Sequence, residues 1–187
     1  MDRPCATFHL NTTQILNSET AGNFTNGINN SYGSINSLRT DLTWYNVDFK
    51  TILGDLYYQY DKFNISLAFI TYGLTANVYG TTANDRTLML NLGGLSFNNC
   101  AYNTQTMSNN SSASIGTITL PGNTVAGSFN FTNDMNTITI LKPNNMTNVR
   151  IFFTRYDNSV PLSSGTGMFP AMDFFFHIYG VTETQHK

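Results

Sequence analysis

Charged residues are scarce in this sequence. Asp, Glu, Lys and Arg together make up 11% of its 187 residues, whereas soluble domains usually contain about 25%. The first thirty residues contain a single basic side chain, Arg3. Proteins that condense nucleic acid need clusters of Lys and Arg to neutralise phosphates. We therefore expect no direct binding of nucleic acid.

Long apolar runs are also missing. No window approaches about 18 continuous apolar residues, the length that a membrane-spanning helix needs, and the N-terminal residues contain no apolar signal-peptide core. We therefore expect a soluble chain with no membrane insertion and no signal peptide. The two cysteines, Cys5 and Cys100, form no CxxC pattern. A single bridge is one interpretation, and two free thiols in a reducing compartment is the other.

Motifs for catalysis, metal binding or cofactor binding are lacking as well, so we predict no catalytic, metal or cofactor residues. No histidine stands in a metal-binding spacing: the three are His9, His177 and His186. The densest carboxylates each adjoin a strand end or a helical turn, where Asp caps backbone amides: they are Asp41, Asp48, Asp55 and Asp61. The sequence therefore predicts a protein that is not an enzyme.

Glycine pairs and aromatic runs have structural interpretations too. Gly93-Gly94 and the segment from Gly165 to Gly167 precede no helix, so we interpret them as turns and not as phosphate-binding loops. The run at residues 174–176 is Phe-Phe-Phe, followed by Tyr179. We expect Phe174 and Phe176 in the core, whereas Phe175 and Tyr179 lie on the other face, suited to packing against a neighbouring subunit.

What the sequence does contain is aromatic residues and period-two alternation. Hydrophobic residues make up 41%, including 14 Phe and 10 Tyr, which favours a folded chain over a disordered one. Eight segments from Leu42 onward have the alternation or length of strands. They are 42–49, 63–69, 88–92, 115–120, 129–131, 137–141, 149–153 and 172–178. A further short strand is expected at Ala6–Leu10, and two short helical turns within Thr51–Tyr60.

Eight strands without crossover helices predict an all-β fold. We expect an eight-stranded antiparallel jelly-roll sandwich, because this architecture lets both sheets hide one apolar face. The Gly, Asn and Ser-rich run from Asn17 to Asn36 is typical of an extended segment. The predicted organisation is thus an extended N-terminal arm at 1–40 followed by a single jelly-roll domain at 41–187.

Three segments resemble single jelly-roll viral capsid proteins. VDFKTILGDLYYQYDKFNISLAFITY, at 47–72, is similar to the junction between the first two strands of the roll. NVRIFFTRYDNSV, at 148–160, resembles the penultimate strand and its polar hairpin tip, and MDFFFHIYGV, at 172–181, the closing strand. The resemblance covers roughly residues 38 to 181. Where relatives that package small genomes carry a basic N-terminal arm, this chain has an almost uncharged one.

A jelly roll of this size without a basic arm is similar to the penton (vertex) proteins of large icosahedral double-stranded DNA viruses. The resemblance implies a homo-oligomer, a ring of five copies, that contacts major capsid protein and minor capsid proteins. It implies a location in the virion capsid after assembly in the host cell cytoplasm. The loops from Tyr102 to Ala113 and from Pro161 to Pro170 would then be outward or intersubunit surfaces.

An alternative from a different class is the trimeric head of a viral fibre that binds a receptor or glycan. Loops rich in Asn, Thr and aromatic residues are compatible with sugar contacts, although no shaft repeats are visible in the sequence. An enzyme or a TNF-like ligand is a remaining interpretation. Eight N-x-S/T sequons are present, about the number that this composition produces by chance: Asn11, Asn23, Asn29, Asn64, Asn109, Asn110, Asn130 and Asn145.

Overall fold

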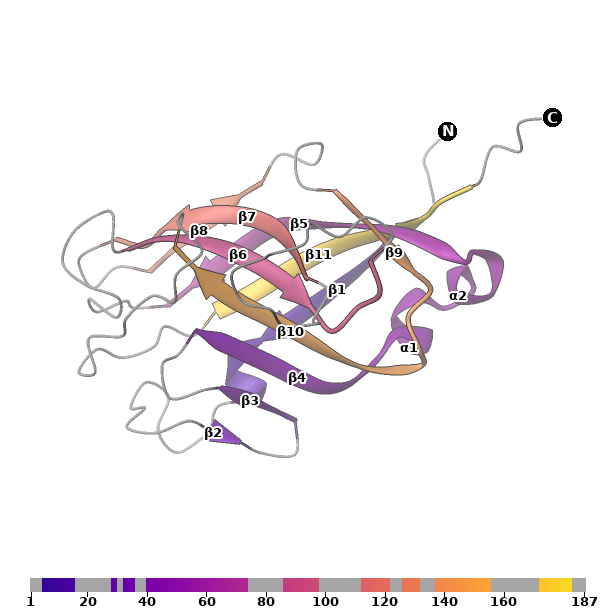
Figure 1. Cartoon of the computed structure of the whole chain (residues 1–187), viewed down its shortest axis with the longest axis horizontal. Coiled ribbons are helices and arrows are strands. Elements are labelled where there is room, and N and C mark those ends of the chain that lie inside the picture. Colours follow the sequence, from indigo (N-terminus) through magenta and orange to yellow (C-terminus); the bar gives the residue numbers. More distant parts are fainter. Residues whose placement is uncertain are drawn as a thin grey trace.

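Two antiparallel β-sheets make up most of the structure (Figure 1). The computed structural model describes residues 5–15, 28–29, 32–35, 40–73, 86–97, 112–121, 126–131, 137–155 and 172–182. Its strands are β1 (Cys5–Asn11), β2 (Ile28–Asn29), β3 (Gly33–Ile35), β4 (Asp41–Asp48), β5 (Lys62–Tyr72), β6 (Thr87–Gly93), β7 (Ser112–Thr119), β8 (Gly127–Asn130), β9 (Ile138–Leu141), β10 (Met146–Thr154) and β11 (Met172–Gly180). The helices are short: η1 (Thr12–Gln14), α1 (Phe49–Leu53) and α2 (Leu56–Gln59). The prediction of an all-β fold is confirmed.

The strands divide into two sheets that face each other. Sheet A has the order β1-β11-β5-β8, and β9 pairs with the other end of β5. Sheet B has the order β2-β3-β4-β10-β6-β7. In Figure 1, β4, β10 and β6 of sheet B pass in front of β11 and β1 of sheet A, and α1 and α2 lie together at one end. We call this the helical end.

The core lies between the sheets and follows the period-two alternation of the strands. On β11 the inward side chains include Phe174 and Phe176, both fully buried as predicted. Trp44 of sheet B meets Phe174 of sheet A edge-on, with ring centroids 6.0 Å apart. Phe8 of β1 stacks on Phe176 at 4.8 Å and meets Phe49 of α1 edge-on at 5.6 Å. Aromatic contacts thus join both sheets and the helical end.

Each of the eight segments predicted as strands from Leu42 onward contains a strand, and so does Ala6–Leu10. The described residues contain eleven strands in all, because β2 and β3 also form a small hairpin beside β4. The predicted helical turns are present as α1 and α2, although α1 begins earlier, at Phe49, which is the residue expected to end the first core strand.

The structure modifies the prediction of a separate arm at residues 1–40. β1 is hydrogen-bonded into sheet A and β3 into sheet B, and Phe8, Leu10 and Ile15 are buried in the common core. This part of the predicted arm packs with the domain because its alternating apolar residues match the inner face of β11. The remainder of Asn17–Asn36 lies largely outside the described residues.

One predicted core residue lies on the other face of its strand. The alternation of Phe63, Ile65 and Leu67 predicts that Phe69 is also inward. The register between β5 and β11 shifts here, because Phe175 pairs with Phe69 but Phe176 pairs with Leu67. The extra residue is Ala68, and such a bulge reverses the direction of the side chains beyond it. Phe69 is therefore on the outer face.

Candidate interaction surfaces

Three aromatic rings stand side by side on the outer face of sheet A. His9 on β1, Phe175 on β11 and Phe69 on β5 come from three adjacent strands. The ring of Phe175 stacks on Phe69 with centroids 4.1 Å apart, and on His9 with centroids 4.3 Å apart. We expected Phe175 to be suited to packing against a neighbouring subunit. Both faces of its ring are covered by side chains of its own chain.

A polar link accompanies this stack. His9 Nε2 lies 2.8 Å from Asp173 Oδ1, and the Thr71 hydroxyl donates to Asp173 Oδ2 at 2.9 Å. The three residues again come from β1, β11 and β5. The contacts of Asp173 with His9 and Thr71, together with the ring stack, hold β1 against the centre of sheet A. The contact between His9 and Asp173 could not be predicted from local sequence, because the two residues are 164 positions apart.

The other candidate histidine and cysteine of this face lie near each other. His177 points away from the core, as its position next to Phe176 predicted, and its Nδ1 lies 3.7 Å from Cys5 Sγ. Cys5 is exposed and is a free thiol, which agrees with the interpretation of unpaired cysteines for this residue. Cys100, His186 and the segment from Gly165 to Gly167 lie outside the described residues, as do residues 102–111 and 161–170.

At the helical end, the predicted capping role is confirmed for one aspartate. Asp48 Oδ1 accepts from the Thr51 amide at 3.0 Å and Oδ2 accepts from the Thr51 hydroxyl at 2.7 Å. The pKa of Asp48 is lowered from its ordinary value, chiefly by these two bonds from Thr51. Asp55 also stands at an N-cap position, but its side chain makes no capping bond. The capping prediction for Asp55 is therefore wrong.

The remaining two aspartates form ion pairs. Asp41 makes a two-pronged pair with Arg150 on the outer face of sheet B, with Nε–Oδ1 2.7 Å and Nη2–Oδ2 2.5 Å. Asp61 lies 3.5 Å from Lys142 Nζ at the helical end. The capping prediction is wrong for Asp41, because strand pairing of β4 with β10 places the guanidinium of Arg150 next to it.

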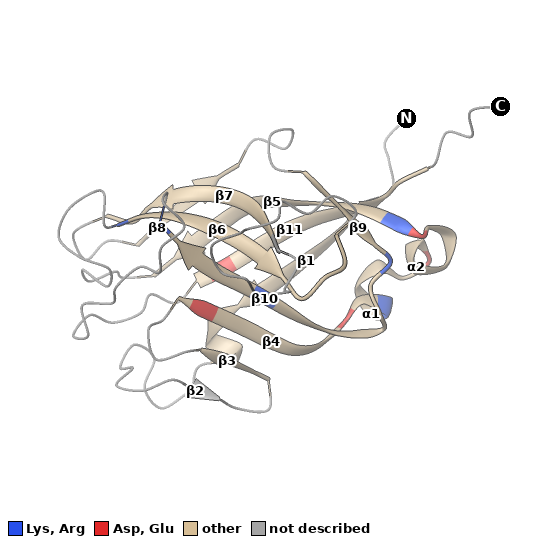
Figure 2. Ribbon diagram, viewed as in Figure 1, with Lys and Arg blue, Asp and Glu red and all other residues tan. Residues whose placement is uncertain are grey.

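Lysines and tyrosines gather at the helical end. Lys50 Nζ lies 5.5 Å from the centre of the Tyr58 ring, and Lys142 Nζ lies 5.2 Å from the centre of the Tyr57 ring. The pKa of Lys50 is raised from its ordinary value, chiefly by a hydrogen bond to Tyr58. Lys62 lies opposite Leu141 in the β5–β9 pairing. Figure 2 shows these basic positions around α1 and α2, interspersed with acidic ones.

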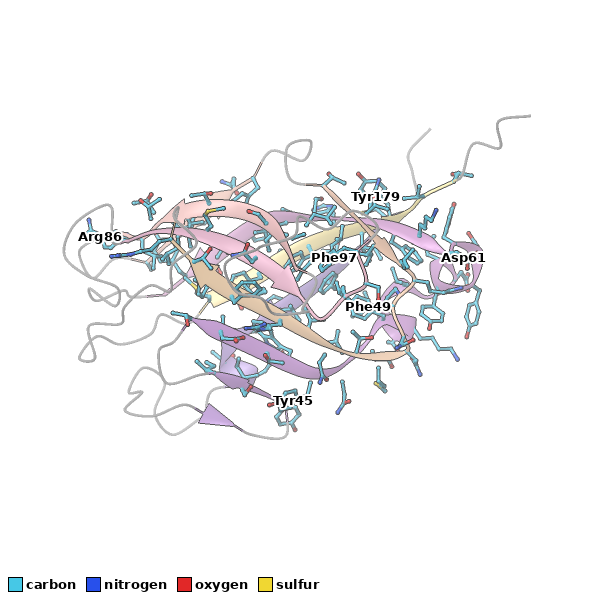
Figure 3. The ribbon with its side chains drawn as sticks, in the orientation of Figure 1. Tyr45, Phe49, Asp61, Arg86, Phe97 and Tyr179 are labelled. Atoms are coloured by element: carbon cyan, nitrogen blue, oxygen red, sulfur yellow. The ribbon has the colours of Figure 1, made fainter. Side chains whose placement is uncertain are left out.

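The helical end also exposes apolar side chains. Four large hydrophobic residues are exposed in the described part of the chain, and three belong here: Tyr58, Leu141 and Met146. Met146 lies opposite Asp48 in the pairing of β10 with β4. Figure 3 shows Asp61 at this end, whereas Phe49 of α1 lies inside the fold. Local sequence patterns do not indicate this cluster, because Tyr58 of α2 is far in sequence from Leu141 of β9 and Met146 of β10, and only the fold brings them to one end.

Within the described ranges, no three His, Cys, Asp or Glu side chains are grouped closely enough to bind a metal ion. Gly93 ends β6 and Gly94 follows it with φ +82°, as expected of a turn. Among the same residues, no helix is long and apolar enough to cross a membrane.

No protein-family model matches this chain. No curated protein matches it either.

Proposed function

We propose that this chain is a jelly-roll structural protein of an icosahedral capsid. The observation that carries the proposal is the nesting of its strand pairs. β1 pairs with β11, β4 with β10, β5 with β8 and β9, and β6 with β7. The chain thus runs outward along four strands and returns beside them as one long hairpin. β11 also pairs with β5, and β10 with β6, as in a hairpin rolled into two facing sheets.

In this arrangement the paired strands occupy eight positions in the two sheets, which is the number of strands in a jelly roll. β8 pairs with residues 69–72 of β5 and β9 with residues 62–65, so the two short strands act as halves of one position. β1 takes the first position. The eight positions therefore differ from those expected from sequence, which began at Leu42 and counted β8 and β9 separately. In this assignment the segment at 47–72 joins the second and third strands.

Within capsid proteins we propose the vertex role, a ring of five copies in the virion. The three resembling segments favour it, and so does the surface. A surface with few charges buries few unpaired ions when identical copies meet. Three of the four large hydrophobic residues that are exposed in the described part of the chain lie at the helical end, namely Tyr58, Leu141 and Met146, and exposed apolar patches mark contact sites. We assign the helical end to contacts with neighbouring major or minor capsid proteins.

The test is the mass of the purified chain and its place in particles. Native mass spectrometry is expected to give assemblies built from five-copy rings, and cryo-EM of particles is expected to show density for the chain at the five-fold vertices. The double variant Tyr58→Ser, Met146→Ser should reduce incorporation into particles while the five-copy ring persists. The matched control is Tyr32→Ser, which alters an exposed tyrosine on the segment before β3.

Two outcomes would overturn the proposal. One is a chain that remains monomeric at all concentrations and is absent from virions. The other is a trimer that binds cells or glycans as an isolated protein, which is the behaviour of a fibre head. Equal incorporation of the Tyr58→Ser, Met146→Ser variant and the Tyr32→Ser control would refute the assignment of the helical end alone.

A further inference from the structure

The first strand of the fold lies at an open edge of sheet A. Among the described strands, β1 pairs only with β11, in continuous register at all seven residues from Cys5 to Asn11 and without a bulge. Its sequence, CATFHLN, contains no Lys, Arg, Asp, Glu, Pro or Gly. Natural edge strands usually carry such residues or bulges, because an unprotected edge pairs with other chains.

The other described edges are shorter or less regular. At the edge of sheet B, β2 has two residues, and in sheet A β8 and β9 have four each. β7 has eight residues, but its pairing with β6 contains a register shift between Leu90 and Asn91. Among the described strands, β1 is therefore the longest edge with regular pairing.

Two contacts show which backbone groups of β1 face the open edge. Trp44 Nε1–H donates to the Asn11 carbonyl at 3.0 Å, so this carbonyl points away from β11. The Met172 amide of β11 donates to Thr12 Oγ1 at 2.8 Å, so this amide points toward β1. Met172 lies opposite Thr12 if the register of β1 and β11 is continued, so the even-numbered residues of β1 direct their backbone groups to β11. In an antiparallel strand, the N–H and C=O of one residue point to the same edge and alternate along the strand. The odd-numbered residues of β1 therefore face outward.

The outward groups of three residues are available for pairing. Among the described residues, nothing bonds to the backbone N–H or C=O that Cys5, Thr7 and His9 direct to the open edge. The side chains of Thr7 and His9 are exposed. The link from His9 to Asp173 and the stack on Phe175 hold this part of the strand in place. The edge is thus a fixed template for one more strand.

We propose that this edge pairs antiparallel with β1 of a second copy of the chain, around a two-fold axis at Thr7. Hydrogen-bonded pairs must join odd-numbered residues of both copies. Because Trp44 already occupies the Asn11 carbonyl, the register that uses every available group centres on Thr7. It places Thr7 opposite Thr7 of the second copy, and Cys5 opposite His9. Each of these three pairs exchanges two hydrogen bonds.

The composition of β1 fits a second copy as the occupant. No residue from Cys5 to Ile15 carries a formal charge when His9 is neutral, so two copies approach without like-charge repulsion across the pair. A Thr–Thr pair across the axis is itself favourable. The pairing would join two copies of sheet A into one continuous sheet.

This inference does not rest on the capsid proposal. A two-fold contact through β1 is separate from the contacts that close a five-membered ring. A dimer, or a ten-copy assembly of two rings, supports the β1 pairing. A five-copy assembly alone would overturn the β1 pairing and support the proposed ring. A dimer without any ring would support the β1 pairing and overturn the ring.

The decisive variant is Thr7→Pro. Proline removes the outward N–H of Thr7 and leaves the bonds of the even-numbered residues to β11, and edge strands tolerate proline. Both bonds of the central pair are lost, so we expect the dimer dissociation constant, from analytical ultracentrifugation, to rise about tenfold or more. Thr7→Val loses the Thr–Thr contact but keeps the N–H, so it should dimerise more tightly than Thr7→Pro. Equal dissociation constants for the two variants would refute the pairing.

Disulfide trapping keeps the proposal testable if Thr7→Pro fails to fold. In a background with Cys5→Ser and Cys100→Ser, Thr7→Cys places one thiol on each side of the axis. The Cα atoms of a hydrogen-bonded pair lie about 5.5 Å apart, which is within disulfide range. Mild oxidation should give a covalent dimer. Ser128→Cys, exposed on β8 at the far side of sheet A, is the matched control and should stay monomeric. Equal cross-linking of both variants would count against the proposal.

Discussion

Two adjacent glycines offer a sharp test of the packing between β6 and β10. Gly94 has φ +82°, and a Cβ added there would overlap the backbone oxygen of Asn148 on β10. Gly93 has no such constraint. A Cβ on Gly93 would lie 3.7 Å from Arg150 Cβ and 3.7 Å from Phe152 Cε1, which is ordinary van der Waals contact. Alanine should therefore destabilise the fold at Gly94 but not at Gly93.

The magnitudes follow from these geometries. A positive φ costs an alanine about 1–2 kcal/mol, and displacing a backbone oxygen held in a sheet costs about 1–3 kcal/mol more. We expect Gly94→Ala to lower the free energy of unfolding by about 2–5 kcal/mol, a fall in Tm of about 5–15 °C. Gly93→Ala should leave stability unchanged or raise it by up to about 1 kcal/mol, because alanine restricts the unfolded chain.

The assay uses the single tryptophan of the chain. Trp44 is buried between the sheets, so its fluorescence reports unfolding by urea or heat. All variants should be compared at one protein concentration, because self-association shifts the apparent Tm. If Gly94→Ala is no less stable than Gly93→Ala, the close approach of Gly94 to β10 is wrong, and with it the described course of the turn.

Two further predictions concern one face of β11 and one helix cap. Phe176→Ala should lower the free energy of unfolding in urea by about 3–5 kcal/mol, because Phe176 is fully buried. Phe175→Ala, on the outer face, should lower it by about 1–2 kcal/mol. Similar losses for the two variants would contradict the assignment of faces. Because the pKa of Asp48 is lowered in the folded state, its contribution to stability is present above the unfolded pKa and is lost as pH falls through the folded value. The Tm of the parent chain should therefore fall more steeply than that of Asp48→Asn below about pH 4, and parallel curves would show that the cap carries no such linkage.

Local sequence patterns predicted the strands, but they did not predict at every position which side chains face the core. Alternation placed Phe174 and Phe176 in the core correctly, because side chains of a regular strand alternate between two faces. It failed at Phe69, where Ala68 bulges out of the pairing with β11. A bulge depends on the partner strand, so the sequence of β5 alone does not reveal it.

The candidate surfaces were predicted less well than the fold. Asp48 was assigned to its cap from local sequence, because its partner Thr51 is three residues away. Asp41 was not, because its partner Arg150 is 109 residues away. At the helical end, Lys142 and Tyr57 are likewise distant in sequence, so their contact was not predicted. Long-range ion pairs and clusters need the strand order before they can be seen.

The sequence by itself determined the class of fold, the position of each main strand and most of the core. These follow from period-two alternation, turn residues and a lack of helical periodicity, which are local properties of the chain. Only the tertiary structure decided that β1 belongs to sheet A, that β8 and β9 share β5, and that β1 is an edge among the described strands. Each of these depends on which distant segments pair, and pairing is set by the packing of the whole core.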